Sequence, residues 1–192
     1  MKHFFAVFAL IVCVANVVQA EESSHMRLLL HSTNVSEGSD VGVAGWVIAP
    51  NLASTPNTWL VVVGPKFSGR NWWMEVLGGA IVSDRTRTEL IDVRAKLPNV
   101  AGCTPWLNLQ VVDFSEGLNS VFYTYFELER PVVEGMINLG LETENTTGSR
   151  VTDDLSAGVH LNIALGSMNI ISVYQWHLDG PDQFWLRVPI NF

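Results

Sequence analysis

Charged residues are scarce in this chain of 192 residues. They make up 16% of it, whereas about 25% is usual for a soluble globular domain. The charges present are mostly negative, with 19 acidic and 11 basic residues. Such a chain has little with which to neutralise a run of phosphates, so we predict no nucleic-acid partner. The length is that of one ordinary domain.

Long apolar runs are also missing after residue 20. No stretch there approaches the roughly 18–20 residues of a membrane-spanning helix, which excludes a bundle of such helices. The one long apolar run lies at the N-terminus, where Phe4 to Val18 follow the basic Lys2 and lead to the small residue Ala20. This pattern is typical of a secretory signal peptide, so we predict that residues 1–20 are cleaved.

Cysteine is nearly absent as well. The chain has two, and because Cys13 lies in the predicted signal peptide, Cys103 alone remains and no intramolecular disulfide can form. The sequence nominates no base that would activate the Cys103 thiol. The five histidines lack a metal-ligand spacing such as His-x-His on one strand face. We therefore expect neither a metal site nor a cofactor.

The chain is rich in alternation of apolar residues with small or polar ones. Residues 155–166 show it most clearly, and residues 91–97, 107–111 and 137–142 repeat it. No segment has a comparable helical spacing, so we predict an all-β fold. Turn residues separate ten predicted strands, which lie near 41–49, 58–67, 71–82, 87–97, 105–114, 120–129, 134–143, 155–166, 168–178 and 183–192.

The last strand carries the most specific pattern. Apolar residues occupy every second position up to the final residue, namely Phe184, Leu186, Val188, Ile190 and Phe192. This segment resembles the closing strand of bacterial outer-membrane β-barrel proteins, in which it is the signal that the assembly machinery reads. The resemblance implies an antiparallel, up-and-down transmembrane β-barrel of about ten strands, with eight to twelve possible. It also implies an even strand number, both chain ends in the periplasm, short turns on that side and longer loops outside.

The predicted turns fit this arrangement. Gly166-Ser167, the tightest turn, falls on the periplasmic side, as do residues 130–133, and the long segment 144–154 falls outside. Several predicted strands have the roughly 9–11 residues that a tilted strand needs to cross a bilayer. Residues 21–40 form an N-terminal segment in which Met26 to His31 could add another strand, and residues 41–192 form the barrel domain. Gly78 and Gly79 are expected to relieve crowding in the wall or to bend it.

If the apolar face meets lipid, the other face lines the lumen. By this alternation we predict as lumen-lining residues Glu75, Asp92, Arg94, Lys96, Asn108, Gln110, Glu127, Glu129, Asn138, Glu142, His160, Asn162, Gln175, His177 and Arg187. These side chains must pair with one another or stay hydrated. Two roles remain open: internal ion pairs that fill a narrow barrel, and a slender porin-like water path with a slight preference for cations.

Two other functions remain as alternatives. A soluble periplasmic or secreted barrel or sandwich that binds an apolar ligand would show the same alternation with its faces reversed. An outer-membrane, lipid-modifying enzyme would need a nucleophile, a base and an orienting group in contact. The candidates are His160 and His177 as bases, Ser156 and Ser172 as nucleophiles, and Asp179 and Glu142 as orienting groups.

The spacing of these groups argues against an enzyme, because Ser156 and His160 lie about 13 Å apart along one strand. We therefore expect a protein without catalytic residues. We place it in the bacterial outer membrane as a monomer, with membrane lipid and the assembly machinery as its partners.

Overall fold

The computed structural model describes residues 24–84, 86–113, 120–148 and 151–192. The predicted signal peptide lies outside these residues. Within them, no helix has the length and apolar character needed to cross a membrane.

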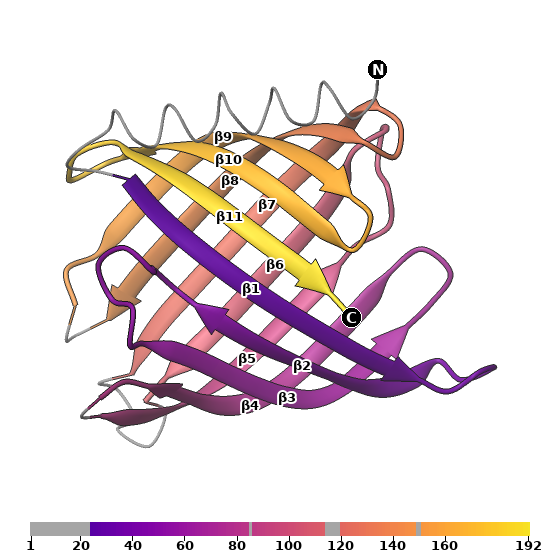
Figure 1. Cartoon of the computed structure of the whole chain (residues 1–192), viewed down its shortest axis with the longest axis horizontal. Helices are drawn as coiled ribbons and strands as arrows, with labels where there is room; N and C mark the ends of the chain where they lie inside the picture. Colours follow the sequence, from indigo (N-terminus) through magenta and orange to yellow (C-terminus); the bar gives the residue numbers. More distant parts are fainter. Residues whose placement is uncertain (1–23, 85, 114–119, 149–150) are drawn as a thin grey trace.

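The described chain folds as a closed barrel of eleven strands (Figure 1). This confirms the prediction of an all-β barrel. The strands are β1 (Ser24–Val35), β2 (Val41–Ala49), β3 (Trp59–Ser68), β4 (Trp73–Val82), β5 (Arg87–Lys96), β6 (Thr104–Val112), β7 (Val121–Val133), β8 (Ile137–Gly148), β9 (Asp154–Leu165), β10 (Met168–His177) and β11 (Gln183–Asn191).

The barrel closes through a parallel pair of strands. β1 pairs with β11 from Ser24 opposite Phe184 to His31 opposite Asn191, and every other neighbouring pair is antiparallel. The predicted even number of strands is therefore wrong. All ten predicted strands are present, and residues 26–31 belong to an additional one, β1. Alternation locates a strand but does not report in which direction its edge pairs, so the sequence could not reveal this closure.

The parallel closure also separates the two ends of the described chain. β1 begins at the end of the barrel where β11 begins, so Ser24 and Asn191 lie at opposite ends. Both termini were expected on one side, which the parallel pair rules out for these strands. The connections 36–40, 69–72, 97–103, 134–136 and 166–167 lie at the end where β11 finishes, and the connections 50–58 and 178–182 lie at the other.

Two predicted turns are largely strand. β7 continues to Val133, and β8 continues to Gly148, so residues 144–148 of the segment expected as the longest outer loop pair with β7. Thr146 and Thr147 lie opposite Tyr123 and Phe122 in this pair. β-Branched threonines favour extended backbone, which explains why this polar segment does not form a loop.

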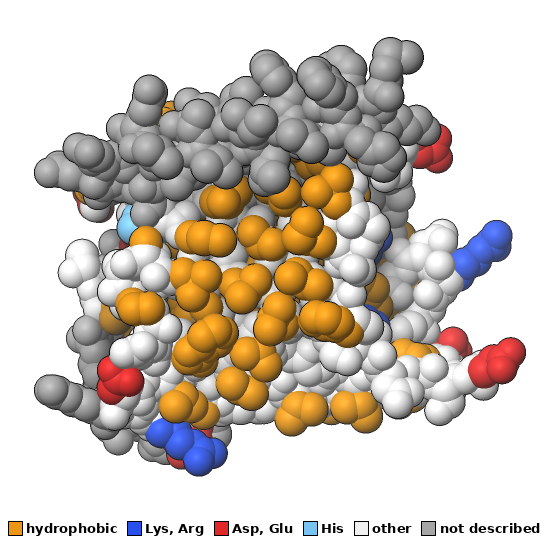
Figure 2. All heavy atoms as spheres, viewed as in Figure 1, with side chains coloured by type: hydrophobic (Ala, Val, Ile, Leu, Met, Phe, Trp, Pro, Cys, Tyr) orange, Lys and Arg blue, Asp and Glu red, His pale blue; other side chains and the backbone are white. Residues whose placement is uncertain are grey.

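The outer wall of the barrel is apolar. In the face that Figure 2 shows, apolar side chains cover the middle of the wall and charged side chains appear at its two ends. Large apolar side chains point outward from most strands and remain exposed, among them Val43, Val63, Val76, Ile91, Leu109, Phe122, Phe126, Leu139, Leu141, Leu155, Val159, Tyr174 and Trp176.

The inner face has two sectors. One is an apolar core of the residues Ala44, Trp46, Ile48, Leu60, Val62, Leu77 and Leu90, with Leu29, Ile81 and Val112 packed against it. The other is polar and contains several buried charged side chains, including Glu142, His160 and Arg187. The barrel is thus apolar outside and largely polar inside, with an apolar inner patch on β2 to β5.

At Gly79, β3 and β4 leave no room for a side chain. A Cβ atom at Gly79 would lie 1.9 Å from the carbonyl oxygen of Val61, whereas one at Gly78 would meet nothing within 4 Å. The expected relief of crowding thus applies to Gly79 and not to Gly78.

We predict that Gly79→Ala lowers the free energy of unfolding by about 2 kcal/mol, because the added methyl group must push β3 and β4 apart. The measurement is the denaturant midpoint of the barrel refolded in detergent micelles. Gly78→Ala is the matched control, for which we expect no loss and at most a gain of about 0.5 kcal/mol. Equal midpoints for the two variants would contradict the crowding.

Candidate functional site in the barrel lumen

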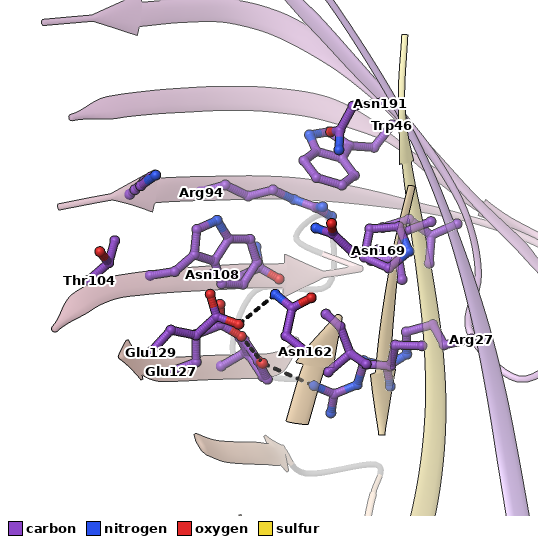
Figure 3. A pocket seen from close by; sticks show the side chains of 18 of the residues that line it. Arg27, Trp46, Arg94, Thr104, Asn108, Glu127, Glu129, Asn162, Asn169 and Asn191 are labelled. Carbon is purple, nitrogen blue, oxygen red and sulfur yellow. Dashed lines mark hydrogen bonds between the residues drawn. The ribbon is translucent and has the colours of Figure 1, made fainter. Parts of the chain in front are cut away.

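The lumen holds a cavity of about 560 Å³. Its lining extends from Asn99, Thr104 and Asn138 near one end of the barrel to Pro50 and Ile81 near the other. Figure 3 shows side chains from widely separated strands converging on this space. Glu127, Glu129 and Asn162 lie on one side of Asn108, and Arg94 lies on its other side. The cavity is a candidate binding site, because charged and amide side chains from several strands line it.

Glu142 is the centre of one buried network. Its carboxylate accepts hydrogen bonds from both terminal nitrogens of Arg187, at 2.9 and 2.8 Å, and from Gln175 at 2.7 Å. The hydroxyl of Tyr125, at 3.1 Å, and Nδ1 of His160, at 3.0 Å, complete the set. Because Glu142 is only 2% exposed, this dense set of donors replaces the hydration that its charge has lost.

Glu144 extends this network across the lumen. It accepts hydrogen bonds from Arg27 and Arg187, both at 2.7 Å, and from Tyr123 at 2.9 Å. Arg27 belongs to β1, and three strands separate β1 from β8 around the wall. The ion pair between Arg27 and Glu144 therefore crosses the interior of the barrel.

His160 depends on a glycine in the neighbouring strand. Gly140 lies directly opposite His160, and a Cβ atom there would lie 2.2 Å from Nε2 of the imidazole. The missing side chain leaves the ring room to contact Glu142 through Nδ1 and Glu129 through Nε2, at 3.0 and 3.2 Å. Gly140 is thus part of the polar network although it contributes no side chain.

A second network surrounds two carboxylates on the other side of the barrel. Glu75, which is fully buried, accepts from Trp46 at 2.7 Å and contacts Lys66 and His31 at 2.9 and 3.1 Å. Asp92, also fully buried, accepts from Arg94, Asn108 and Gln110. Arg94 lies 4.3 Å from the centre of a Trp46 ring, and this contact joins the two groups.

The structure distributes the predicted lumen residues over two layers. Those that line the cavity itself are Arg94, Lys96, Asn108, Gln110, Glu127, Glu129, Asn138, Asn162 and Arg187. Those buried in the networks behind it are Glu75, Asp92, Glu142, His160 and Gln175. His177 lies apart from both, where it contacts Asp154 at 2.7 Å.

Several interior residues escaped the sequence reasoning. Arg27 and His31 lie in residues 26–31, which the sequence marks only as a possible extra strand, and Glu144 lies in the segment predicted as an outer loop. Tyr125 is an aromatic residue whose hydroxyl bonds to two carboxylates. The alternation of residues 137–142, continued for one more step, would have predicted Glu144 as a lumen-lining residue.

The enzyme candidates are engaged in other contacts. The Ser156 hydroxyl donates to the backbone carbonyl of Glu144 at 2.6 Å. Among the described residues, no hydrogen bond joins Ser156 to His160 or His177. Asp179 lies in the connection between β10 and β11. His160 contacts the candidate orienting group Glu142 at 3.0 Å, whereas the Ser156 hydroxyl is bonded to the backbone.

Glu127, Glu142 and His160 are the described residues best placed to hold a metal ion. They bring one potential ligand atom each to within 4.8 Å of one another. They come from three different strands, which is why no spacing in the sequence indicated them. Glu142, however, already accepts from five donor atoms, and both ring nitrogens of His160 face carboxylates. As it stands, the group is a hydrogen-bonded charge network.

Comparison with known proteins yields no relative of this chain. No protein-family model, no curated protein and no solved structure matches it. What the barrel does must therefore be inferred from its wall and its lumen.

The Glu142 network generates a stability prediction. Replacing Arg187 by Gln leaves two buried carboxylates short of a cation, so we expect a loss of about 3 kcal/mol in the free energy of unfolding. Arg130→Gln, at an exposed position of β7, is the control and should change stability by less than about 0.5 kcal/mol. The measurement is denaturant unfolding in detergent micelles.

The double variant Arg187→Gln/Glu142→Gln separates a specific pair from general damage. Because both ends of the ion pair are then gone, we expect its loss to be smaller than the sum of the two single losses, by about 1 kcal/mol or more. Additive losses would mean that the two side chains do not stabilise each other.

Proposed function

We propose that this chain is a membrane-embedded β-barrel of the bacterial outer membrane, and that its lumen is a narrow channel for small polar solutes. The observation that carries the proposal is the distribution of polarity. The wall exposes apolar side chains to the surroundings and encloses charged ones.

The exposed side of the wall supports a lipid environment. Leu141 and Val63 keep 60% and 59% of their surface exposed, while Glu75 and Asp92 keep none. A water-soluble domain seldom exposes a contiguous apolar patch larger than a few hundred Å². Hydrocarbon around the barrel would make this wall favourable, whereas water around it would not.

The strand lengths support the same environment. The eleven strands contain 9 to 13 residues each. About 9–11 residues suffice for a tilted strand to cross the apolar part of a bilayer.

The lining of the lumen is evidence that the solute is polar. The cavity is lined on one side by apolar side chains such as Ile48 and Leu60, and elsewhere by Arg94, Lys96, Glu127 and several amide side chains. The charged and amide groups favour a polar solute over a wholly apolar ligand. The two ion-pair networks hold side chains of neighbouring strands together. The cavity lies between these networks along the barrel. Side chains of this kind can replace part of the water around a small hydrated solute.

The charge of the cavity wall suggests weak selectivity between simple ions. Its lining includes four cationic side chains, Arg27, Arg94, Lys96 and Arg187, and two acidic ones, Glu127 and Glu129. The other acids of the networks lie behind this surface, and all three arginines are paired with them. This distribution of charge on the cavity wall does not favour the slight preference for cations over anions that the count of predicted lumen residues suggested.

The first test is fractionation of a Gram-negative host that expresses the full chain. We expect the protein in the outer-membrane fraction, with a gel mobility in SDS that changes on boiling. The purified barrel in a planar bilayer should then give small, steady KCl currents. Heat-modifiable protein without current would identify a plugged, structural barrel, and recovery from the soluble periplasm would overturn the membrane proposal.

The orientation of the wall can be tested with a single arginine. Val159→Arg, in the middle of the outer face of β9, should cost about 2–4 kcal/mol in a bilayer and impair insertion. Leu155→Arg, on the same face near the end of that strand, is the matched control and should cost at most about 1 kcal/mol. The measurement is denaturant unfolding of the barrel in lipid vesicles. If water covered this face instead, the two variants would be equally stable.

A further inference from the structure

We propose that the cavity selectively binds small zwitterions, molecules that carry a primary ammonium group and a carboxylate a few bonds apart. The proposal rests on the proposed channel function, because it names the class of solute that the same cavity takes. It derives from one row of side chains on β5, β6 and β7.

Lys96, Trp106 and Glu127 lie side by side in this row. Lys96 is opposite Trp106 in the pair of β5 and β6, and Trp106 is opposite Glu127 in the pair of β6 and β7. All three line the cavity. Because neighbouring strands are about 4.8 Å apart, the backbones of Lys96 and Glu127 are roughly 10 Å apart, with the indole between them.

The cation of this row has no partner among the side chains that the structure describes. Among the described residues, no hydrogen bond or ion pair joins Lys96 to another side chain, and the neighbouring Arg94 is bound to Asp92 at 2.7 Å. The ammonium group of Lys96 is thus available to a carboxylate in the cavity.

The opposite end of the row is an acceptor site. Among the described residues, only the Tyr125 hydroxyl donates to Glu127, and no lysine or arginine pairs with it. The imidazole of His160 lies nearby and contacts Glu129 and Glu142. Glu129 adds a second carboxylate on the same strand face. Asn162 donates to Glu129 at 2.7 Å, and its own Oδ1 is buried without a partner. These oxygens suit a ligand that brings several N–H donors, as a primary ammonium group does.

Trp106 suits the chain between the two charged groups. It lies in an edge-to-face contact with Tyr125, with ring centres 5.2 Å apart, so it presents an apolar surface between the two poles. A methylene chain can lie along the indole, and the adjacent ammonium group can gain from its ring electrons. A simple cation or a simple anion satisfies one pole only and leaves the other unpaired.

The experiment uses the full-length barrel refolded in detergent micelles, with 5-aminopentanoate as the probe in isothermal titration calorimetry. Pentylammonium and pentanoate, which each keep one charge, are the ligand controls. We expect the probe to bind at least about tenfold more tightly than either control, the equivalent of about 1.4 kcal/mol.

Two variants test the poles of the site. Lys96→Gln and Glu127→Gln should each weaken binding of the probe about tenfold or more. Arg87→Gln and Glu134→Gln, at exposed positions away from the row, make the same charge changes and should leave binding unaltered. The exchange Lys96→Glu/Glu127→Lys keeps one pole of each sign and should restore binding with the ligand reversed. Boiled and unboiled gel samples of every variant verify that it has folded, and Lys96→Gln alone suffices if Glu127→Gln does not fold.

The outcomes separate this proposal from the channel function. Equal affinity for the probe and the two controls, or no effect of either charge variant, would overturn the zwitterion site even if KCl currents are seen. Selective binding without any KCl current would retain the site and overturn the channel. With both correct, the probe should reduce the KCl current of the wild type and leave that of Lys96→Gln unchanged.

Discussion

The compensation of buried carboxylates is the constraint on which the interior of this barrel depends. Placing Glu142 and Glu144 side by side on one face of β8, away from bulk water, would be strongly unfavourable without nearby cations. Arg187 reaches both carboxylates, and Arg27 reaches Glu144 from β1. Tyr125, His160 and Gln175 then take the remaining acceptor positions. Much of the inner wall of β7 to β11 follows from this requirement.

The same requirement accounts for the shape of the cavity. On the β2 to β5 side, Glu75 and Asp92 have their own local donors, and apolar side chains fill the space around them. Each side of the barrel is thus internally satisfied, and the space between them is left open. The side chains that face this space from β5 and β7, Lys96 and Glu127, are the charged groups with the fewest partners. A ligand can therefore interact with them without dismantling either network.

Much of the barrel could be predicted from the sequence because its wall separates two environments. Alternation as regular as that of residues 155–166 can only be a strand with unlike faces, and it indicates which residues share a face. The pattern does not indicate what lies across the lumen. Arg27 meets Glu144 although 117 positions separate them, and only the curvature of the closed wall brings them together. The parallel pairing of β1 escaped prediction for a related reason, because a strand edge can accept a neighbour in either direction.

The position of the two arginines links the ion pairs to the order in which the barrel forms. Arg27 lies on β1 and Arg187 on β11, the two strands of the closing seam. That seam joins residues such as His31 and Asn191, 160 positions apart, so it is the contact with the greatest loss of chain entropy and among the last expected to form. Until then, Glu144 lacks Arg27, one of its two cations, and holds water in the unfinished lumen. Closure of the seam therefore also completes the neutralisation of Glu144, which penalises a barrel that closes without β1 in place.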